Sequence, residues 1–367
     1  MTQSQGFFDK SLSEHSSIKK QIVVDYFKFW AKTIGKSSTN LVYLDLFAGE
    51  IYKDKELCTG LEITHIASKD IFLKKNLQII LNDKDKKKVA CLENFISENE
   101  FNNRFNHKPL IFNIEVNEST PELIKNLSDH QIFCFIDPCG YVGLTLELVK
   151  TVISSWGCDC VVFFSTSGIY RNIGIKRNQR NLKEIYGERI FDNLLQKIAS
   201  NKHKKVELII DEFRKACKFI GADYFLPFQI NFSNSYRVSH HIIYLSKHPL
   251  GFKIMKDIMA KYSVTEDGIP LFLTSDGWSE VGDIQNFIYS NRMNNLKNKL
   301  LSEYCNQELK VASIINNIHR KGELYTDKNI KTALIELENE NAISVIAASK
   351  RRKIGTMSDN NIIKFPD

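Results

Sequence analysis

The chain alternates between apolar runs of strand length and amphipathic segments of helix length, and this alternation restricts its fold more than any other feature. Residues 14–34 place apolar side chains at helical spacing and predict an opening helix. Five apolar runs then predict strands, at residues 41–49, 76–83, 108–116, 132–138 and 158–167. Helical segments separate these runs, and parallel strands need such crossover connections. We therefore predict a mainly parallel α/β sheet.

A β-hairpin is predicted after the five strands, with residues 224–232 and 236–246 as its two arms. Alternating strands closed by an antiparallel hairpin are the order of a class I methyltransferase sheet, whereas most dinucleotide-binding folds lack the hairpin. The stretch 171–222 predicts a basic helical insertion before the hairpin. We therefore predict a Rossmann-like methyltransferase domain over residues 1–265.

The last part of the chain has a different pattern. Residues 301–367 read as helix, short strand, helix, and two β segments around a basic loop, which predicts a winged-helix-like module after a connecting segment at 266–300. A small α/β module that only packs against the rest of the chain fits the same pattern. As a nucleic-acid-binding wing, the loop would present Lys350, Arg351, Arg352 and Lys353.

Composition places the chain among soluble globular proteins, with 43% hydrophobic and 25% charged residues. No apolar run approaches the roughly 20 residues that span a bilayer, and the N-terminus has no hydrophobic export core. The eight cysteines form no CxxC pair, so neither a zinc site nor a disulfide framework is expected. A reducing cytoplasm is the expected location.

The positive charge is concentrated in one segment. Residues 171–218 hold 13 Lys/Arg and 6 Asp/Glu, an excess equal to the net charge of +7 of the whole chain. Such a segment is either a solvated helical face or a surface for an acidic partner such as nucleic acid. On the second interpretation, the cations that would contact nucleic acid are Arg171, Lys176, Arg177 and Arg180.

Acidic side chains lie at the ends of four predicted strands. They are Asp45, Asp83, Glu115 and Asp137. Ligands of parallel α/β sheets bind outside the carboxyl ends of the strands, so these acids would face one cleft. A single acid in such a place more often caps a helix. The four together favour a ligand site.

S-adenosylmethionine (SAM) suits these acids better than a dinucleotide, because it carries no pyrophosphate and needs no full GxGxxG cradle. Asp83 would accept hydrogen bonds from both ribose hydroxyls. Asp45 would orient the loop or meet the cofactor's ammonium group, and Glu115 or a neighbouring amide would contact adenine. The loop would let its backbone approach the ligand at a glycine, in Phe47-Ala48-Gly49.

The segment Asp137-Pro138-Cys139-Gly140 resembles the Asp-Pro-Pro-aromatic motif of amino-methyltransferases. In that motif the acid or amide accepts a hydrogen bond from the target amine, and the aromatic ring stacks on the base. Here Tyr141 comes one residue late and Cys139-Gly140 replaces the second proline. The candidate catalytic residues are Asp137, Pro138 and Tyr141. The simpler alternative is a strand-to-helix turn in which Asp137 caps the next helix.

The blocks "VYLDLFAG", "FIDPCGYVGLTLELV", "VVFFSTSGIYRN" and "YRVSHHIIYLSKHPLGFKIMKDIM" resemble the three-Cys-motif partner protein family (TcmP) in order and spacing. The resemblance implies a bacterial, cytoplasmic, methyltransferase-like protein. Genes of this family tend to accompany a phage-type protein with a three-cysteine, radical-SAM-like motif, which implies a protein partner. The family's first loop commonly reads Phe-Ala-Gly-Pro-Gly, whereas here Glu50-Ile51 follows Gly49, and Cys58-Thr59-Gly60 replaces a Gly-Ser-Pro segment.

Two functional hypotheses follow. The first is a SAM-dependent methyltransferase that acts on nucleic acid or a nucleotide, in a phage-defence or mobile-element setting; Asp83 and Asp137-Pro138 favour it. The alternative is a catalytically degenerate Rossmann protein that serves as a nucleic-acid-binding or scaffold subunit; Glu50-Ile51 favours it. Hydrolysis is disfavoured because the acids are spread over strand ends instead of being paired at metal-ligand spacing. His240-His241 lie in a strand, so their rings would point to opposite faces.

Overall fold

The chain forms two compact units, residues 1–232 with 237–258 and residues 233–236 with 259–367. Four residues singled out from the sequence, Glu50, Ile51, Lys350 and Arg351, lie outside the described residues. A computed structural model describes residues 14–49, 56–233, 235, 237–266, 269–274, 292–348, 352–353 and 355–366.

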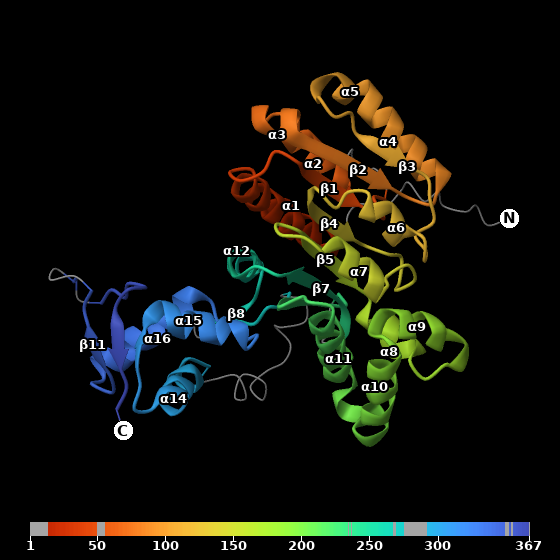
Figure 1. The fold of residues 1–367 in the computed structure, drawn as a ribbon. Helices are drawn as coiled ribbons and strands as arrows, with labels where there is room; N and C mark the ends of the chain where they lie inside the picture. The colour runs from red at the N-terminus through yellow and green to blue at the C-terminus, as the bar shows by residue number, and fades with distance from the viewer. Residues whose placement is uncertain are drawn as a thin grey trace. The chain divides into compact units, whose positions relative to one another are not determined.

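A seven-stranded sheet forms the centre of the first unit, in the order β3-β2-β1-β4-β5-β7-β6 (Figure 1). β1 to β5 run parallel, and β7 is antiparallel to both β5 and β6. This order confirms the predicted, mainly parallel sheet with a terminal antiparallel hairpin. The strands are β1 (Leu41–Asp45), β2 (Leu77–Asn82), β3 (Leu110–Phe112), β4 (Gln131–Ile136), β5 (Asp159–Phe164), β6 (Tyr224–Asn231) and β7 (Val238–Ser246).

The central strands are almost continuously apolar because both faces of the sheet are covered. Alternate side chains of β4 serve opposite faces: Cys134 and Ile136 join the core under α7, whereas Phe133 packs against α1 (Glu14–Ile34). The other helices around the sheet are α2 (Thr59–Ala67), α3 (Ile71–Asn76), α4 (Lys86–Glu98), α5 (Phe101–Arg104), α6 (Thr120–Lys125), α7 (Leu146–Val152) and α12 (Pro249–Lys261).

Helix α1 spans the sheet from the carboxyl ends of its strands to their amino ends. Near the amino ends, the Tyr26 hydroxyl donates to Asp159 Oδ2 at 2.5 Å and Trp30 Nε1 donates to the Gly157 carbonyl at 2.9 Å. Near the carboxyl ends, Lys19 reaches Asp137, which directly follows β4. The helix therefore brings its first turns to the edge of the sheet where the predicted acids lie.

The predicted helical insertion follows β5 and is visible in Figure 1 as the green helices beside the sheet. Its helices are amphipathic and enclose Tyr186, Phe191 and Phe213, which are fully buried. Phe213 stacks on Phe164 of β5 with ring centroids 4.6 Å apart, so the insertion shares the sheet's core. The elements are α8 (Thr166–Asn172), η3 (Lys176–Asn178), α9 (Gln179–Tyr186), α10 (Glu188–Ser200), η4 (Lys202–Lys204) and α11 (Lys205–Phe219).

Among the described residues, the second unit has its own core, formed by three helices and a three-stranded antiparallel sheet in the order β10-β12-β11. Leu296 and Leu300 of α14 are buried in this core, although the sequence placed them in a connecting segment. The elements are β8 (Thr265–Glu266), β9 (Ile269–Pro270), α14 (Arg292–Tyr304), β10 (Glu308–Lys310), α15 (Val311–Arg320), α16 (Asp327–Asn339), β11 (Ser344–Ile346) and β12 (Ile362–Lys364).

Within the described part of the chain, none of the helices combines the length and apolar character needed to cross a membrane. All eight cysteines are free thiols. Cys134, Cys158 and Cys160 are buried at the sheet, where each behaves as a small apolar side chain.

Candidate functional site

Asp45 ends β1 and points inward, with only 1% of its surface exposed. Its Oδ1 accepts a hydrogen bond from the Phe47 amide at 3.2 Å, and its Oδ2 accepts one from the Tyr43 hydroxyl at 3.3 Å. Burial raises the pKa of Asp45 to about 7; the Phe47 amide opposes this rise and the nearby Asp137 carboxylate adds to it. In the structure Asp45 therefore holds the loop after β1 in place through its hydrogen bond with the Phe47 amide.

Asp83 follows β2 directly and is held by two backbone amides. Its Oδ2 accepts from the Gly49 amide at 3.2 Å, and its Oδ1 accepts from the Asp85 amide at 2.9 Å. Gly49 has φ +73°, a left-handed conformation that favours glycine, so this residue lets the loop present its amide to Asp83. Lys88 Nζ lies 3.7 Å from Oδ2, within ion-pair distance but too far for a hydrogen bond, so each carboxylate oxygen keeps a further lone pair for a ligand hydroxyl.

Asn82 lies one residue before Asp83 and links three strands, a role that the sequence analysis missed. Its Nδ2 donates to the carbonyls of Leu46 and Ile114, both at 2.9 Å, and its Oδ1 accepts from the Ile114 amide at 3.0 Å. The loops after β1 and β3 are thereby tied to the end of β2. A buried asparagine at the end of an apolar strand was the available signal.

Glu115 lies beyond β3 and is exposed, with its Oε1 3.5 Å from Lys84 Nζ. A cavity of about 320 Å³ lies beside this loop, between the ends of the first three strands and α6. Its wall is apolar apart from Asn82, Thr120 and Asn126, and it includes Leu46, Ile114 and Val116. Ligand pockets in proteins typically start at about this size.

Asp137 follows β4, and its carboxylate forms an ion pair through Oδ2 with Lys19 of α1. The Lys19 and Asp137 side chains are 11% and 21% exposed. No hydrogen bond to Asp137 Oδ1 occurs among the described residues, and the next helix is capped by Thr145, whose Oγ1 accepts from the Leu148 amide at 3.1 Å. Asp137 is therefore not the cap of α7, contrary to the simpler interpretation of this turn.

Lys19 also contacts an aromatic pair on the same face of the sheet. Its Nζ lies 4.4 Å from the centroid of Phe163, which stacks on His240 with centroids 4.4 Å apart and an interplanar angle of 10°. His241 points to the other face, where its Nδ1 lies 2.7 Å from Thr166 Oγ1. Burial lowers the pKa of His241 to about 3, so this ring is neutral at pH 7.

Tyr141 lies in the turn after β4, which we call the Asp137 corner (residues 137–141), and it faces the helical insertion. It is half-buried, and its Cδ1 lies 3.5 Å from the position that a Cβ would take at Gly168 of α8. The neighbouring Phe47 ring approaches the Cβ position of Gly143 to 3.0 Å, so the loops after β1 and β4 are in contact. Pro138 is buried in the same corner.

The predicted nucleic-acid-binding cations fall into two groups. Arg171, Lys176 and Arg177 are exposed, and none has a carboxylate within ion-pair distance in the described ranges. Arg180 instead contacts Glu118 Oε1 at 2.7 Å and Glu184 Oε1 at 3.4 Å.

Arg352 is bound to α16 rather than presented to solvent. Its two terminal nitrogens each lie 2.5 Å from one oxygen of Glu338, and its Nε donates to the Thr356 carbonyl at 2.9 Å. The side chain is 16% exposed. Lys353 is exposed.

The residues that the sequence assigned to the cofactor and to the substrate lie around one end of the sheet. Asp45, Asp83 and Asp137 follow neighbouring strands, because β1 lies between β2 and β4. Lys19 was missed since it precedes the first strand and belongs to a helix that the sequence marked only as amphipathic. Among the described residues, no group of three or more His, Cys, Asp or Glu could hold a metal ion.

Comparisons with known proteins do not assign the chain to a family. No family model matches the chain and no curated protein matches it, so the TcmP resemblance stays a prediction. Solved structures with some likeness, all at 10% identity, include the Legionella pneumophila protein LPL1258 (66% of this chain, 88% of that chain, TM-score 0.37). Others are the methyltransferase domain of bacterial CtHen1-C (62%, 98%, 0.32) and a candidate rRNA methylase from Clostridium thermocellum (61%, 97%, 0.29).

These likenesses are too low to bear on function. The class is defined by the strand order β3-β2-β1-β4-β5-β7-β6, with β7 antiparallel to its neighbours. This is a Rossmann-like class I methyltransferase fold, and Asp45, Asp83 and Asp137 lie at the carboxyl ends of its strands, the edge at which open α/β sheets generally bind ligands.

Proposed function

We propose that the protein is a SAM-dependent methyltransferase that acts on nucleic acid or a nucleotide. The observation that carries the proposal is the placement of three carboxylates at the ends of adjacent strands. One of them, Asp137, keeps an oxygen without a hydrogen-bond partner among the described residues. This edge of an open α/β sheet is where such folds bind their ligands.

The residues at this edge fit the cofactor's nucleoside. Asp83 is fixed by the Gly49 and Asp85 amides, and each of its oxygens can accept one ribose hydroxyl. The neighbouring apolar cavity of about 320 Å³ would accommodate a planar base, with Thr120 and Asn126 as polar contacts. Glu115 is exposed beside this cavity and would contact the adenine edge only after turning away from Lys84.

When bound, SAM supplies an electrophilic methyl group. Asp137 Oδ1 would accept a hydrogen bond from the target amine and hold its nitrogen lone pair toward that methyl group. Lys19 keeps the carboxylate in place through Oδ2, and Tyr141 at the same corner would contact the target base. Asp137 is the candidate catalytic residue, and Lys19 is a positioning residue.

A second candidate function is a scaffold or nucleic-acid-binding subunit without turnover, completed by a protein partner such as the three-cysteine protein that the TcmP resemblance implies. The Lys19–Asp137 ion pair is the observation that favours it. A carboxylate whose charge is already compensated by a lysine attracts the amine of a ligand less strongly than an unpaired carboxylate does.

Calorimetric titration with SAM and S-adenosylhomocysteine tests the proposal. We expect micromolar binding by the native chain and at least a tenfold loss in Asp83→Ala. The matched control is Asp85→Ala, in the same loop, which removes only the cap of α4. Retained folding of each variant is checked by thermal unfolding.

Transfer of a labelled methyl group to DNA, RNA and nucleotide pools tests the chemistry. Asp137→Ala is expected to abolish transfer while cofactor binding persists. Normal methylation by Asp137→Ala would overturn the site assignment. If the folded chain binds neither cofactor, the methyltransferase proposal fails for the isolated chain, and a stable protein complex without turnover would establish the scaffold function.

A further inference from the structure

We propose that the end of α8 and the turn η4 form a binding surface for single-stranded nucleic acid. Binding of the strand does not depend on the proposed function; only methylation of the bound strand does. We call this binding surface the Tyr170 surface. It consists of Tyr170 and Arg171 of α8, Lys202, His203 and Lys204 of η4, and Lys176 and Arg177 of η3. The turn η3 is tied to the end of α8 because Asn178 Nδ2 donates to Asn172 Oδ1 at 2.6 Å.

Two segments that are distant in the chain meet at this surface. Lys205, the first residue of α11, donates from Nζ to the Tyr170 carbonyl at 2.6 Å, and the same Nζ lies 3.9 Å from the centroid of the Tyr170 ring. The turn η4 directly precedes Lys205, so Lys202 and Lys204 come beside the end of α8. Neither segment alone would form the surface.

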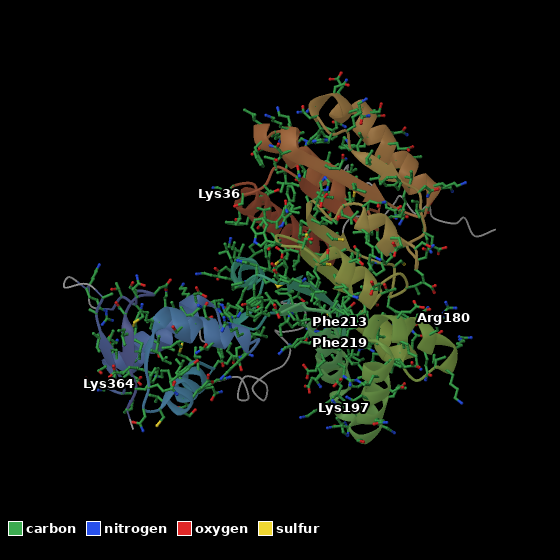
Figure 2. The ribbon with its side chains drawn as sticks, in the orientation of Figure 1. Lys36, Arg180, Lys197, Phe213, Phe219 and Lys364 are labelled. Carbon is green, nitrogen blue, oxygen red and sulfur yellow. The ribbon has the colours of Figure 1, made fainter. Side chains whose placement is uncertain are left out.

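The cations of the Tyr170 surface carry uncompensated charge. Arg171, Lys202 and Lys204 are exposed, and within the described ranges none has a carboxylate at ion-pair distance. Other cations of the insertion, two of which Figure 2 labels, are neutralised: Arg180 by Glu118 at 2.7 Å, Lys183 by Glu188 at 2.8 Å and Lys197 by Glu212 at 2.6 Å. Arg189 and Lys218 are also exposed and have no carboxylate at ion-pair distance among the described residues, but most of the unpaired cations of the insertion belong to the Tyr170 surface, which suits a row of phosphates.

An exposed aromatic ring among these cations selects unpaired bases. Tyr170 is 42% exposed and Ile175 beside it is 39% exposed, although large apolar side chains are usually buried. A protein ring can stack on a base only when the base is free of its duplex neighbours. The combination of cations and an exposed ring therefore fits a single strand better than a duplex.

The Tyr170 surface continues into the candidate catalytic corner. Gly168 of α8 lies against Tyr141, and Arg171 follows Gly168 by three residues, so both face the same side of the helix. Asn172 is fixed to the same turn by a hydrogen bond from Nδ2 to the Gly168 carbonyl at 2.8 Å. A strand whose phosphate is held by Arg171 would thus bring an adjacent base toward Tyr141 and Asp137.

Fluorescence anisotropy with a labelled oligonucleotide, as a single strand and as a duplex of the same sequence, tests the proposal. We expect the single strand to bind at least tenfold more tightly. The triple variant Arg171→Gln/Lys202→Gln/Lys204→Gln should make the negative slope of log affinity against log salt concentration shallower by about 2. This change corresponds to three lost phosphate contacts on a single strand. Tyr170→Ser should weaken single-strand binding about tenfold and leave that slope unchanged.

The matched control is Arg180→Gln/Lys183→Gln/Lys197→Gln, which removes the same charge from paired cations of the same insertion. Equal weakening by this control, equal binding of duplex and single strand, or no binding would each overturn the proposal. The result is independent of cofactor binding. Oligonucleotide binding without SAM binding would support the Tyr170 surface and contradict the methyltransferase proposal. SAM binding without oligonucleotide binding would contradict the Tyr170 surface and leave the cofactor site supported.

Discussion

The ammonium group of Lys19 forms an ion pair with the carboxylate of Asp137, although 118 residues separate them in the chain. The pair ties the first turns of α1 to the end of β4, at the centre of the candidate site. Because both side chains are largely buried, the loss of one partner leaves a charge that water solvates poorly.

Replacement of Lys19 by Met should lower the free energy of unfolding by about 1–3 kcal/mol, since Asp137 then lacks its counter-charge. Lys19→Arg should recover most of this loss, as a guanidinium also pairs with a carboxylate. Urea denaturation measures both effects. Lys28→Met, which removes a more exposed lysine of the same helix, is the control. A Lys19→Met variant as stable as the native chain would show that the pair contributes nothing.

Asp45 should make the stability of the first unit depend on pH. Its folded-state pKa is about 7, above the value of about 3.9 in an unfolded chain. Between these pH values the folded chain keeps a proton that the unfolded chain releases. The stabilisation is therefore complete below about pH 4 and is lost as the pH rises to about 7.

Asp45→Asn should flatten that part of the pH profile, because an amide does not titrate. Its oxygen can still accept from the Phe47 amide, and its NH2 group would donate to the Tyr43 hydroxyl, which is the donor in the native chain. Urea denaturation at a series of pH values gives the difference between native and variant chains, at most about 1.4 kcal/mol for each pH unit. Asp129→Asn, an exposed acid, serves as control. Identical profiles for the native chain and Asp45→Asn would contradict the assigned titration.

Asn82→Ala should destabilise the first unit by about 2–3 kcal/mol, because it removes three hydrogen bonds to Leu46 and Ile114 and leaves the buried Leu46 carbonyl without a donor. Denaturant unfolding is the measurement. Asn113→Ala, which loses one bond to the Asp83 carbonyl at a more exposed position, should cost less than half as much. A larger loss for Asn113→Ala would refute the role given to Asn82.

The Arg352–Glu338 pair should hold the loop before β12 on α16. Arg352→Gln and Glu338→Gln are each expected to accelerate amide hydrogen exchange in β12, and the double variant should add little to either change, because both remove the same bidentate contact. Strictly additive effects would show that the two residues act independently. Lys353→Gln, at an exposed position, should leave exchange unchanged.

The predicted strands and helices agree with the structure because their signals are local. The opening helix was predicted over residues 14–34 and α1 covers the same residues, while each predicted strand of the first unit contains the observed one or misses it by a single residue. In the second unit the short strand predicted between two helices was wrong: residues 321–326 between α15 and α16 form no strand, and β10 precedes α15 instead. The predicted strands were longer than β1 and β3, since apolar residues such as Leu46 and Ile114 continue into loops that Asn82 holds. In the sequence, an apolar residue in a loop next to a strand gives the same signal as one in the strand.

The sequence by itself determined the order of the seven sheet strands, the opening helix and the acids at the strand ends, because hydrophobic periodicity and turn residues act over a few neighbouring positions. Only the tertiary structure decided which charges meet. It paired Lys19 with Asp137 and Arg352 with Glu338, and it brought Lys204 beside Tyr170 through Lys205. Such pairings depend on the packing of whole helices, and the energy of an ion pair depends on distance in space rather than on separation along the chain.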